Sequence, residues 1–355
     1  MPSNATGLLV ARPTIVIDGE EKPEIGGGLL NLAIVENTHG LYRCEMKIGN
    51  WGNVNGSIDF LYFDRQTIEF GKDFEITLNG DSIFKGKIMG IEAAFPEGAP
   101  PEINILAEDR FQDLRMTRRT RTFDDSSDSD ALTQIANDHG LTPDISIDGP
   151  SYKVLAQVNQ SDLAFMRERT RAIGAELWIE DRTLHAASRS DRAGETIELS
   201  HGAQLREFSA LADLAGQRTS VTVSGWDVSA KDTLSYEADD SVIGSELNGD
   251  TSGVSILSSA LGDRKETLAH TMPLTSNEAQ SYAEAFFRMS CRRFVVGRGV
   301  AETSSSLRVG TFVNLKKLGP LFSGKYYLAE VRHVFDSAKG IRTEFTAERP
   351  GIGSN

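Results

Sequence analysis

The end of the chain alternates apolar and polar side chains, as strands do when one face of a sheet is buried. Such runs cover residues 298–315, 321–335 and 340–350. Four glycines stand where the runs need turns: Gly310, Gly319, Gly324 and Gly340. The pattern predicts a closing set of strands that completes a β-barrel, with only a short tail, 351–355, after it.

The first third of the chain shows the same alternation. Strands are predicted at 14–18, 30–36, 41–48, 74–78, 83–88 and 103–109. Asn37–Gly40 and Asn79-Gly80-Asp81 separate neighbouring runs and are typical of hairpin turns. We therefore expect a first β-barrel domain over residues 1–109.

The pattern changes between residues 110 and 195, where helical spacing mixes with short strands. Ser129 or Asp130 is expected to cap one helix that ends near Gly140, and Ser161 a second that ends at Gly174. A strand at 152–158 and a hairpin at 176–186 complete the segment. The sequence predicts a small α/β insert here.

The second strand-rich region, 196–350, contains one long helix. Thr275 and Glu278 form the sequence signature of a capping box, which predicts a helix at about 276–292 with an apolar face formed by Tyr282, Phe286 and Met289. Residues 239–263 are rich in Ser, Gly and Asp and predict a mobile loop. The fold class expected for the whole chain is mainly β (α+β), with two β-barrel domains and the insert between them.

Composition narrows the functional classes. Of the 355 residues, 39% are hydrophobic and 25% charged, so a buried core is expected, and a formal net charge of -14 disfavours nucleic acid and anionic membranes as main partners. The two cysteines, Cys44 and Cys291, lie far apart in apolar runs and are expected to be buried thiols. No apolar run approaches the ~20 residues that span a bilayer. We expect folding and assembly in the cytoplasm.

Candidate chemistry is sparse. The histidines stand outside the spacings typical of zinc or triad enzymes: His39, His139, His185, His201, His270 and His333. The acidic run Asp124–Asp130 lacks the glycine and terminal glutamate of a calcium loop and precedes a predicted helix, where carboxylates favour the N-terminus. The sequence predicts no catalytic, cofactor-binding or metal-binding residue, and no cofactor.

One dense basic run stands out in this acidic chain. It contains Arg115, Arg118, Arg119 and Arg121. A nucleic-acid site is disfavoured, because the run is short and has no interleaved aromatic residues. Two interpretations remain: a solvated linker, or a strip of inter-subunit or partner contacts that sets the orientation of neighbouring chains.

Several motifs in order carry a resemblance to a known family. They are Gly225-Trp226-Asp227 with Lys231, Phe322-Ser323-Gly324 with Tyr326, Val331 and His333, Thr343 with Phe345 and Arg349, and the block Asn159–Arg169. Together they resemble the late control protein D family of contractile phage tails, over roughly residues 70–350. The pattern is also similar to the hub half of type VI secretion spike proteins and of extracellular contractile injection spikes.

The resemblance implies a structural baseplate hub without enzymatic activity. Two tube-like barrels per chain and three chains per ring would give a homotrimeric adaptor that joins the inner tube to the spike. Implied partners are a separate spike protein and the inner tube or a tube-initiator protein, with cargo in the lumen as a further idea; the product would belong to a phage tail or an injection particle. The alternative from another class is a stand-alone cell-wall glycan hydrolase or glycan-binding β protein.

Overall fold

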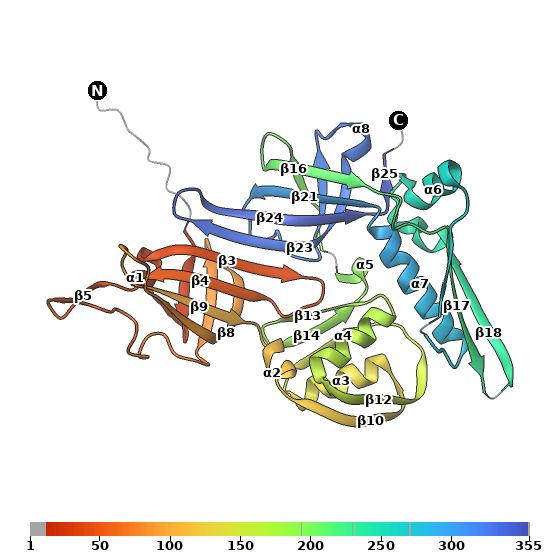
Figure 1. The fold of residues 1–355 in the computed structure, drawn as a ribbon, viewed down its shortest axis with the longest axis horizontal. Coiled ribbons are helices and arrows are strands. Elements are labelled where there is room, and N and C mark those ends of the chain that lie inside the picture. The colour runs from red at the N-terminus through yellow and green to blue at the C-terminus, as the bar shows by residue number, and fades with distance from the viewer. Residues whose placement is uncertain (1–11, 193, 229, 270, 354–355) are drawn as a thin grey trace.

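The computed structural model describes residues 12–192, 194–228, 230–269 and 271–353. Strands dominate, and the helices are few and mostly short, so the mainly β fold class is confirmed. Figure 1 shows an elongated molecule with the N-terminal strands at one end, a helix-containing insert on one side and a long hairpin at the other end.

The N-terminal strands form one curved antiparallel sheet. Its strands are β1 (Thr14–Ile17), β2 (Glu20–Glu21), β3 (Leu29–Asn37), β4 (Arg43–Gly49), β7 (Asp73–Leu78), β8 (Asp81–Ala94) and β9 (Glu102–Glu108). They pair in the order β3-β4-β9-β8-β7-β1-β2. Helix α1 (Pro23–Gly27) and the small hairpin of β5 (Gly52–Val54) and β6 (Ser57–Asp59) lie in the connections.

The Asn79-Gly80 turn confirms the predicted hairpin between β7 and β8. Asn79 has φ 54° and Gly80 φ 94°, and Leu78 pairs with Asp81 across the turn. Positive φ at both central residues is the geometry whose twist matches that of paired strands, and Asn-Gly adopts it at low cost.

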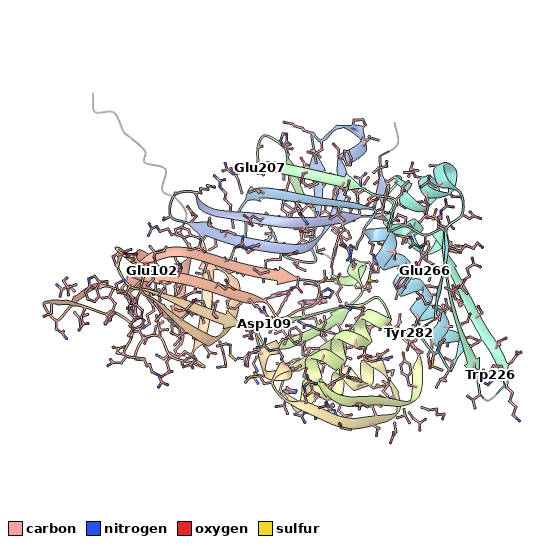
Figure 2. The ribbon with its side chains drawn as sticks, in the orientation of Figure 1. Glu102, Asp109, Glu207, Trp226, Glu266 and Tyr282 are labelled. Carbon is pink, nitrogen blue, oxygen red and sulfur yellow. The ribbon has the colours of Figure 1, made fainter. Side chains whose placement is uncertain are left out.

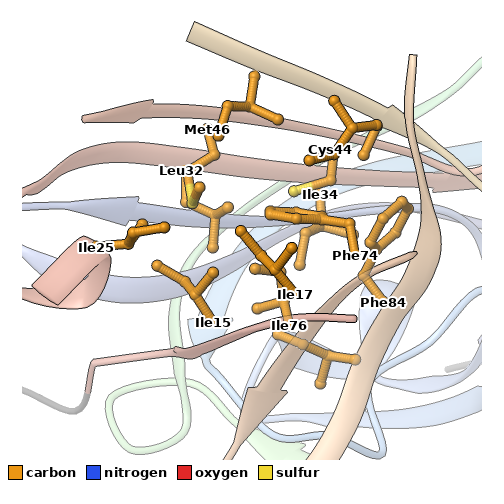
Figure 3. Packing of buried hydrophobic residues seen from close by; sticks show 14 of the residues in the cluster. Ile15, Ile17, Ile25, Leu32, Ile34, Cys44, Met46, Phe74, Ile76 and Phe84 are labelled. Atoms are coloured by element: carbon orange, nitrogen blue, oxygen red, sulfur yellow. The ribbon is translucent and has the colours of Figure 1, made fainter. Parts of the chain in front are cut away.

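The alternating positions of these strands meet in the first core. Ile15, Ile34, Met46 and Ile76 come from four different strands and are fully or almost fully buried. Figure 3 shows these side chains packed between the strands, with Phe74 and Phe84 at one end. Among the described residues no ladder returns from β1 or β2 to β3, so the sheet curves around its core without closing by hydrogen bonds.

Within the described residues, the insert combines two longer and two short helices with two small sheets. α2 (Phe111–Arg115) leads into β10 (Arg118–Ser127), which pairs with β12 (Ser151–Ser161); β11 (Thr142–Ser146), β13 (Glu176–Glu180) and β14 (Thr183–Ala187) form the second sheet. α3 (Asp128–Asp138) and α4 (Asp162–Ala172) pack against them, and α5 (Arg189–Arg192) follows. The cap of α4 is Ser161, as predicted, whereas Ser127 rather than Ser129 or Asp130 caps α3.

The C-terminal strands form a second curved sheet. They are β15 (Ile197–Ser200), β16 (Leu205–Ala212), β21 (Val295–Glu302), β22 (Phe312–Lys316), β23 (Gly324–Asp336) and β24 (Gly340–Arg349). Their order is β15-β22-β23-β24-β21-β16. The closing strands therefore lie largely within the predicted runs, but residues 303–311 form a loop between β21 and β22, and the second run begins with a short helix, α8 (Gly319–Phe322).

Strand β23 joins the two curved sheets. Its first residues pair with β22, and after a register shift between Leu328 and Glu330 the same edge pairs with β3, from Glu330 opposite Asn37 to Asp336 opposite Asn31. Phe335 of β23 is buried in the first core. The two β regions thus share one continuous sheet, although they lie almost three hundred residues apart in the sequence.

A separate hairpin and helix form the far end of the molecule. β17 (Ser220–Asp227) pairs with β18 (Asp232–Asp239) and with β20 (Lys265–Leu268), and α7 (Ser276–Arg292) packs on them. Thr275 caps α7 by accepting from Glu278 N, as predicted. The predicted apolar face is confirmed in part: Tyr282 and Phe286 are half-buried and pack against the core beneath α7, but Met289 is exposed. The fully buried Phe287 was not predicted.

The prediction of an irregular mobile loop at 239–263 is also wrong. The segment folds into a 3₁₀ helix η1 (Asp240–Glu246), a short strand β19 (Thr251–Ser252) and helix α6 (Gly253–Leu261). β19 pairs with β25 (Gly351–Ile352), and Ile243, Val254 and Leu257 are buried. Small helices α8 (Gly319–Phe322) and α2 complete the set of short elements.

Separate hydrophobic clusters follow the three expected regions. One lies in the first sheet, one in the insert, and two in the C-terminal region: inside the curved sheet and between β17 and α7. The boundaries after residues 109 and 195 stay a prediction, since strand pairing and packing cross them, and residues 1–11 and 354–355 lie outside the described part.

Candidate functional site

The three regions of the chain meet at a buried ionic junction centred on Glu176 at the start of β13. Glu176 Oε1 accepts a hydrogen bond of 2.9 Å from Arg189 Nε, and its Oε2 accepts one of 2.9 Å from a terminal nitrogen of Arg192. Both arginines come from the short helix α5, and three residues of spacing place them on the same side of one helical turn. The carboxylate is thereby held from two directions.

The C-terminal sheet contributes the other side of this junction. The hydroxyl of Tyr327, on β23, donates to Glu176 Oε2, and Arg189 lies 2.9 Å from Glu348 Oε2 on β24 as an ion pair. The guanidinium of Arg189 also stacks over the Tyr327 ring at 4.4 Å. Burial and the neighbouring Glu176 carboxylate raise the pKa of the Tyr327 hydroxyl well above its usual range, so Tyr327 stays a donor.

The N-terminal sheet enters through Tyr42 and Glu36. Arg192 donates a 2.7 Å hydrogen bond to the Tyr42 hydroxyl and lies over the Trp178 ring at 4.4 Å. Glu36, on β3, is almost fully buried and pairs with Arg308 from the loop before β22, while Val309 N donates to it at 3.1 Å. The junction therefore connects residues from all three regions.

The electrostatics of the junction favour a fixed structure. Burial acts to lower the pKa of Arg189 and Arg192, but the adjacent carboxylates and tyrosines outweigh it and raise both, so the guanidinium groups stay charged. Removing one member of a buried, hydrogen-bonded ion pair leaves an uncompensated charge, which is why such groups hold one relative orientation of the elements that carry them.

A cleft of about 670 Å³ opens beside the junction, between β7 and β8 on one side and β13 and β14 on the other. Asp109 lies in its wall and accepts hydrogen bonds from Tyr42 N at 2.8 Å and Phe111 N at 3.0 Å. Burial raises the pKa of Asp109 to about 7. Figure 2 places Asp109 where the first sheet meets the insert. The contact with Phe111 N fixes the start of α2, and the contact with Tyr42 N holds the residue before β4, so both are structural.

Two arginines of the basic run, Arg119 and Arg121, form ion pairs inside the insert. Arg121 donates to Asp138 at 2.7 Å and to the buried Asp162 at 2.8 Å, and its guanidinium lies over the Phe123 ring. Arg119 pairs with the same Asp162 at 3.1 Å. Hydrogen bonds from His139 and Gln157, together with the charges of Arg121 and Arg119, outweigh burial and lower the pKa of Asp162.

The first two arginines of the run remain near the surface. Arg115 makes two hydrogen bonds to Glu108, at 3.1 and 2.6 Å, and its side chain is 40% exposed. Arg118 donates to the Asn159 carbonyl at 2.8 Å and has no carboxylate partner within the described part of the chain. The structure thus separates the run into an internal anchor and an exposed basic end, and its role in inter-subunit or partner contacts stays a prediction.

The remaining candidates show structural environments. His333 is fully buried and contacts the Thr343 hydroxyl at 2.9 Å, and burial lowers the pKa of His333 to about 3, so it is neutral. Cys44 and Cys291 are free and buried. The described residues contain no cluster of three or more side chains able to hold a metal ion, and none of their helices is long and apolar enough to cross a bilayer. His270 lies outside the described residues.

Comparison with known proteins shows which family and which solved structures the chain is similar to. Residues 10–336 match the model of the family described as the Alg8 N-terminal domain. The chain belongs to that family. No curated protein matches the chain.

Solved structures share the fold over almost the whole chain. A 43 kDa tail protein of prophage MuSo2 from Shewanella oneidensis has a TM-score of 0.70 and 13% identity, with 96% of this chain and 98% of that chain covered. A tail protein from Neisseria meningitidis MC58 has a TM-score of 0.69, 13% identity and 96% and 97% coverage. The Escherichia coli c3393 protein, described as a type VI secretion component, has a TM-score of 0.56, 12% identity and 96% and 79% coverage. The chain therefore has the fold of phage tail and type VI secretion proteins, as the late control protein D resemblance implies.

The junction residues were missed by the sequence analysis. The missed residues occupy ordinary strand, helix and loop positions, and nothing in their spacing indicates that they contact one another. They are Glu36, Glu176, Arg192, Arg308 and Tyr327. The available signal was local: Arg189 and Arg192 stand three residues apart directly after an apolar strand, which is an unusual place for two cations unless carboxylates lie opposite.

Proposed function

We propose that the chain is the structural hub of a contractile tail-like machine, in which a homotrimer joins the inner tube to the spike. The observation that carries the proposal is the shared fold with tail proteins over 96% of the chain, in the arrangement of two curved sheets and an insert. Fold likeness alone does not fix function, so the physical features of the molecule add the second support.

The buried ion pairs and the continuous sheet of the chain suit a rigid ring that transmits force. The three regions are locked by the junction around Glu176, and one continuous sheet runs through β23 from the first core to the second. A ring of identical chains meets through heterologous contacts that close on themselves. A hub must transmit force between tube and spike without bending, and buried charge pairs with directional hydrogen bonds oppose such bending.

The proposed partners follow from this position. One side of the trimer would bind a separate spike protein, and the other side would bind the first ring of the inner tube or a tube-initiator protein. A cargo could also bind inside the lumen of the ring. Assembly would take place in the cytoplasm, into a phage tail or an injection particle. The net charge of -14 opposes adhesion to nucleic acid during that assembly. We propose no enzymatic activity for the chain.

Co-expression with candidate tube and spike proteins tests the proposal. We expect the chain to co-purify with both, and native mass spectrometry of the complex to give three hub copies. The alternative, a cell-wall glycan hydrolase or glycan-binding protein, predicts a monomer that binds or cleaves peptidoglycan and ignores tube and spike. Peptidoglycan turnover by the purified chain would overturn the hub proposal.

A further inference from the structure

An exposed aromatic patch marks the N-terminal end of the molecule. Trp51 and Phe60 flank the β5–β6 hairpin, and Phe95 follows β8; their rings contact one another edge to face, at 5.2 Å for Trp51–Phe60 and 6.2 Å for Phe60–Phe95. All three are exposed, and Phe95 is 66% exposed. Contiguous exposed aromatic groups of this kind mark contact surfaces, because water is a poor environment for them. We call Trp51, Phe60 and Phe95 the aromatic patch.

The aromatic patch has an acidic surround. Asp59 precedes Phe60, and Glu97 follows Phe95 by two residues. Asp64 follows Phe60 by four residues, and Glu92 lies near the end of β8. All four are exposed, and none of them forms an ion pair with another described residue. A partner for this patch should therefore present apolar groups together with free positive charge.

A second uncovered surface lies on the insert. β10 and β12 form a two-stranded sheet whose inner face, with Phe123 and Leu155, packs against α3 and α4. Its outer face carries Val154, Ala156 and Val158, all exposed, and Val158 is 64% exposed. Figure 1 shows β10 and β12 as the outermost layer of the insert, away from the β5 end of the molecule. We call Val154, Ala156 and Val158 the outer β face.

The basic run ends at this outer β face. Arg118 pairs with Ser161 in the β10–β12 ladder and has no carboxylate partner within the described ranges, and the exposed Met116 lies just before it. Arg119 keeps a 40% exposed side chain beside its contact to Asp162. The outer β face thus combines apolar residues with positive charge at its Arg118 end, while the exposed Asp124, opposite Val154, lies at its other end. The Arg118 end is the complement of an aromatic patch with an acidic surround.

We propose that the aromatic patch of one copy docks on the outer β face of the next copy. The two surfaces occupy different places on one chain, so their contact is heterologous and builds a ring rather than a symmetric pair. The opposite charges at the two surfaces fix which end of the β10–β12 ladder faces Asp59 and Glu97. The inference rests on the proposed function, since it names the contact between copies of the hub ring.

Thiol cross-linking between two variants tests this contact. Cys44 and Cys291 are each 1% exposed, so an introduced surface cysteine is the reactive one. Phe95→Cys protein is mixed with Val158→Cys protein and treated with a short bismaleimide at the highest soluble concentration. We expect a mixed cross-linked product, and little product when Phe95→Cys is mixed with Leu211→Cys, which is also 66% exposed but lies on β16.

The outcomes separate this inference from the proposed hub. A trimer by native mass without the Phe95–Val158 product, or with equal linking to Leu211→Cys, overturns the docking surfaces and leaves the hub proposal standing. A chain that stays monomeric and unlinked alone and with the spike contradicts both. Glycan cleavage by a monomer contradicts the hub itself.

Two substitutions, one of an aromatic side chain and one of a charge, test the same contact by its association constant. Phe95→Ser should weaken association by about tenfold or more, as loss of an aromatic anchor does, with little change in melting temperature because the ring is mostly exposed. Arg118→Glu should weaken it roughly fivefold at low salt and less at high salt. The Leu211→Ser control should associate like the parent. Parent-like association of Phe95→Ser would overturn the proposal.

Discussion

Replacing Glu176 by Gln should destabilise the protein far more than the same change at a surface ion pair. Glu176 is 6% exposed and accepts from Arg189, Arg192 and Tyr327, so the neutral amide leaves two buried guanidinium groups with reduced compensation. Removing one partner of a buried pair typically costs about 3–5 kcal/mol. For a cooperative unit of ordinary domain size, that corresponds to a melting temperature lower by about 6–20 °C.

Glu344→Gln is the matched control. Glu344 pairs with Arg332 across β23 and β24 at 2.9 Å, the same distance as the Glu176 contacts, but both side chains are almost half exposed. An exposed pair of this kind contributes about 1 kcal/mol or less, so the melting temperature should fall by no more than about 4 °C. Differential scanning calorimetry of both variants and the parent measures the difference. Equal shifts for the two variants would show that water reaches Glu176 and that the junction does not lock the three regions.

Three further predictions concern other parts of the chain. Phe287→Ala should cost about 3–5 kcal/mol of unfolding free energy, and Phe286→Ala clearly less, because only Phe287 is fully buried; a larger loss for Phe286→Ala in urea titrations would contradict the observed helix face. His333 has its pKa lowered to about 3, so the unfolded chain takes up a proton below pH ~6.5 that the folded chain does not. The His333 contribution to stability should therefore fall by about 2 kcal/mol from neutral pH to pH 5, and the parent should lose about that much more stability than His333→Gln over this range. Amide exchange in α6 (Gly253–Leu261) should be slow at its buried positions, and exchange at the rate of an unfolded loop would contradict its helical structure.

Local patterns in the sequence predicted much of the secondary structure. Alternation located β23 and β24, and Asn79-Gly80 located a turn that the backbone angles confirm. Thr275 and Ser161 cap the helices expected of them. These features succeed because the chemistry that forms them lies within a few neighbouring residues.

The failures have physical causes as well. In the segment 239–263 the polar composition suggested a loop, although the segment contains η1 and α6. Ser252 caps α6, and only a few of its apolar residues, such as Val254 and Leu257, pack into the core. In α7, Phe286 and Phe287 are adjacent, and composition alone does not decide which of two neighbours faces β17 and β18. A helix face shifts by 100° per residue, so one position changes the buried side.

The candidate site shows most clearly what local sequence patterns cannot predict. The pairing of β3 with β23 and the contact of Glu36 with Arg308 join residues that are far apart in the sequence. No local pattern encodes such meetings, which depend on the whole topology. The basic run, by contrast, was found from the sequence, but its division into the partly buried Arg121 and the exposed Arg118 required the structure.

The most direct test of the central claim is cryo-electron microscopy of the assembled particle, with this chain carrying a small tag. The account predicts tag density at three positions around the axis, in one closed ring between the inner tube and the spike. Density elsewhere in the particle, a copy number other than three in that ring, or a particle that assembles fully without this chain would contradict the account.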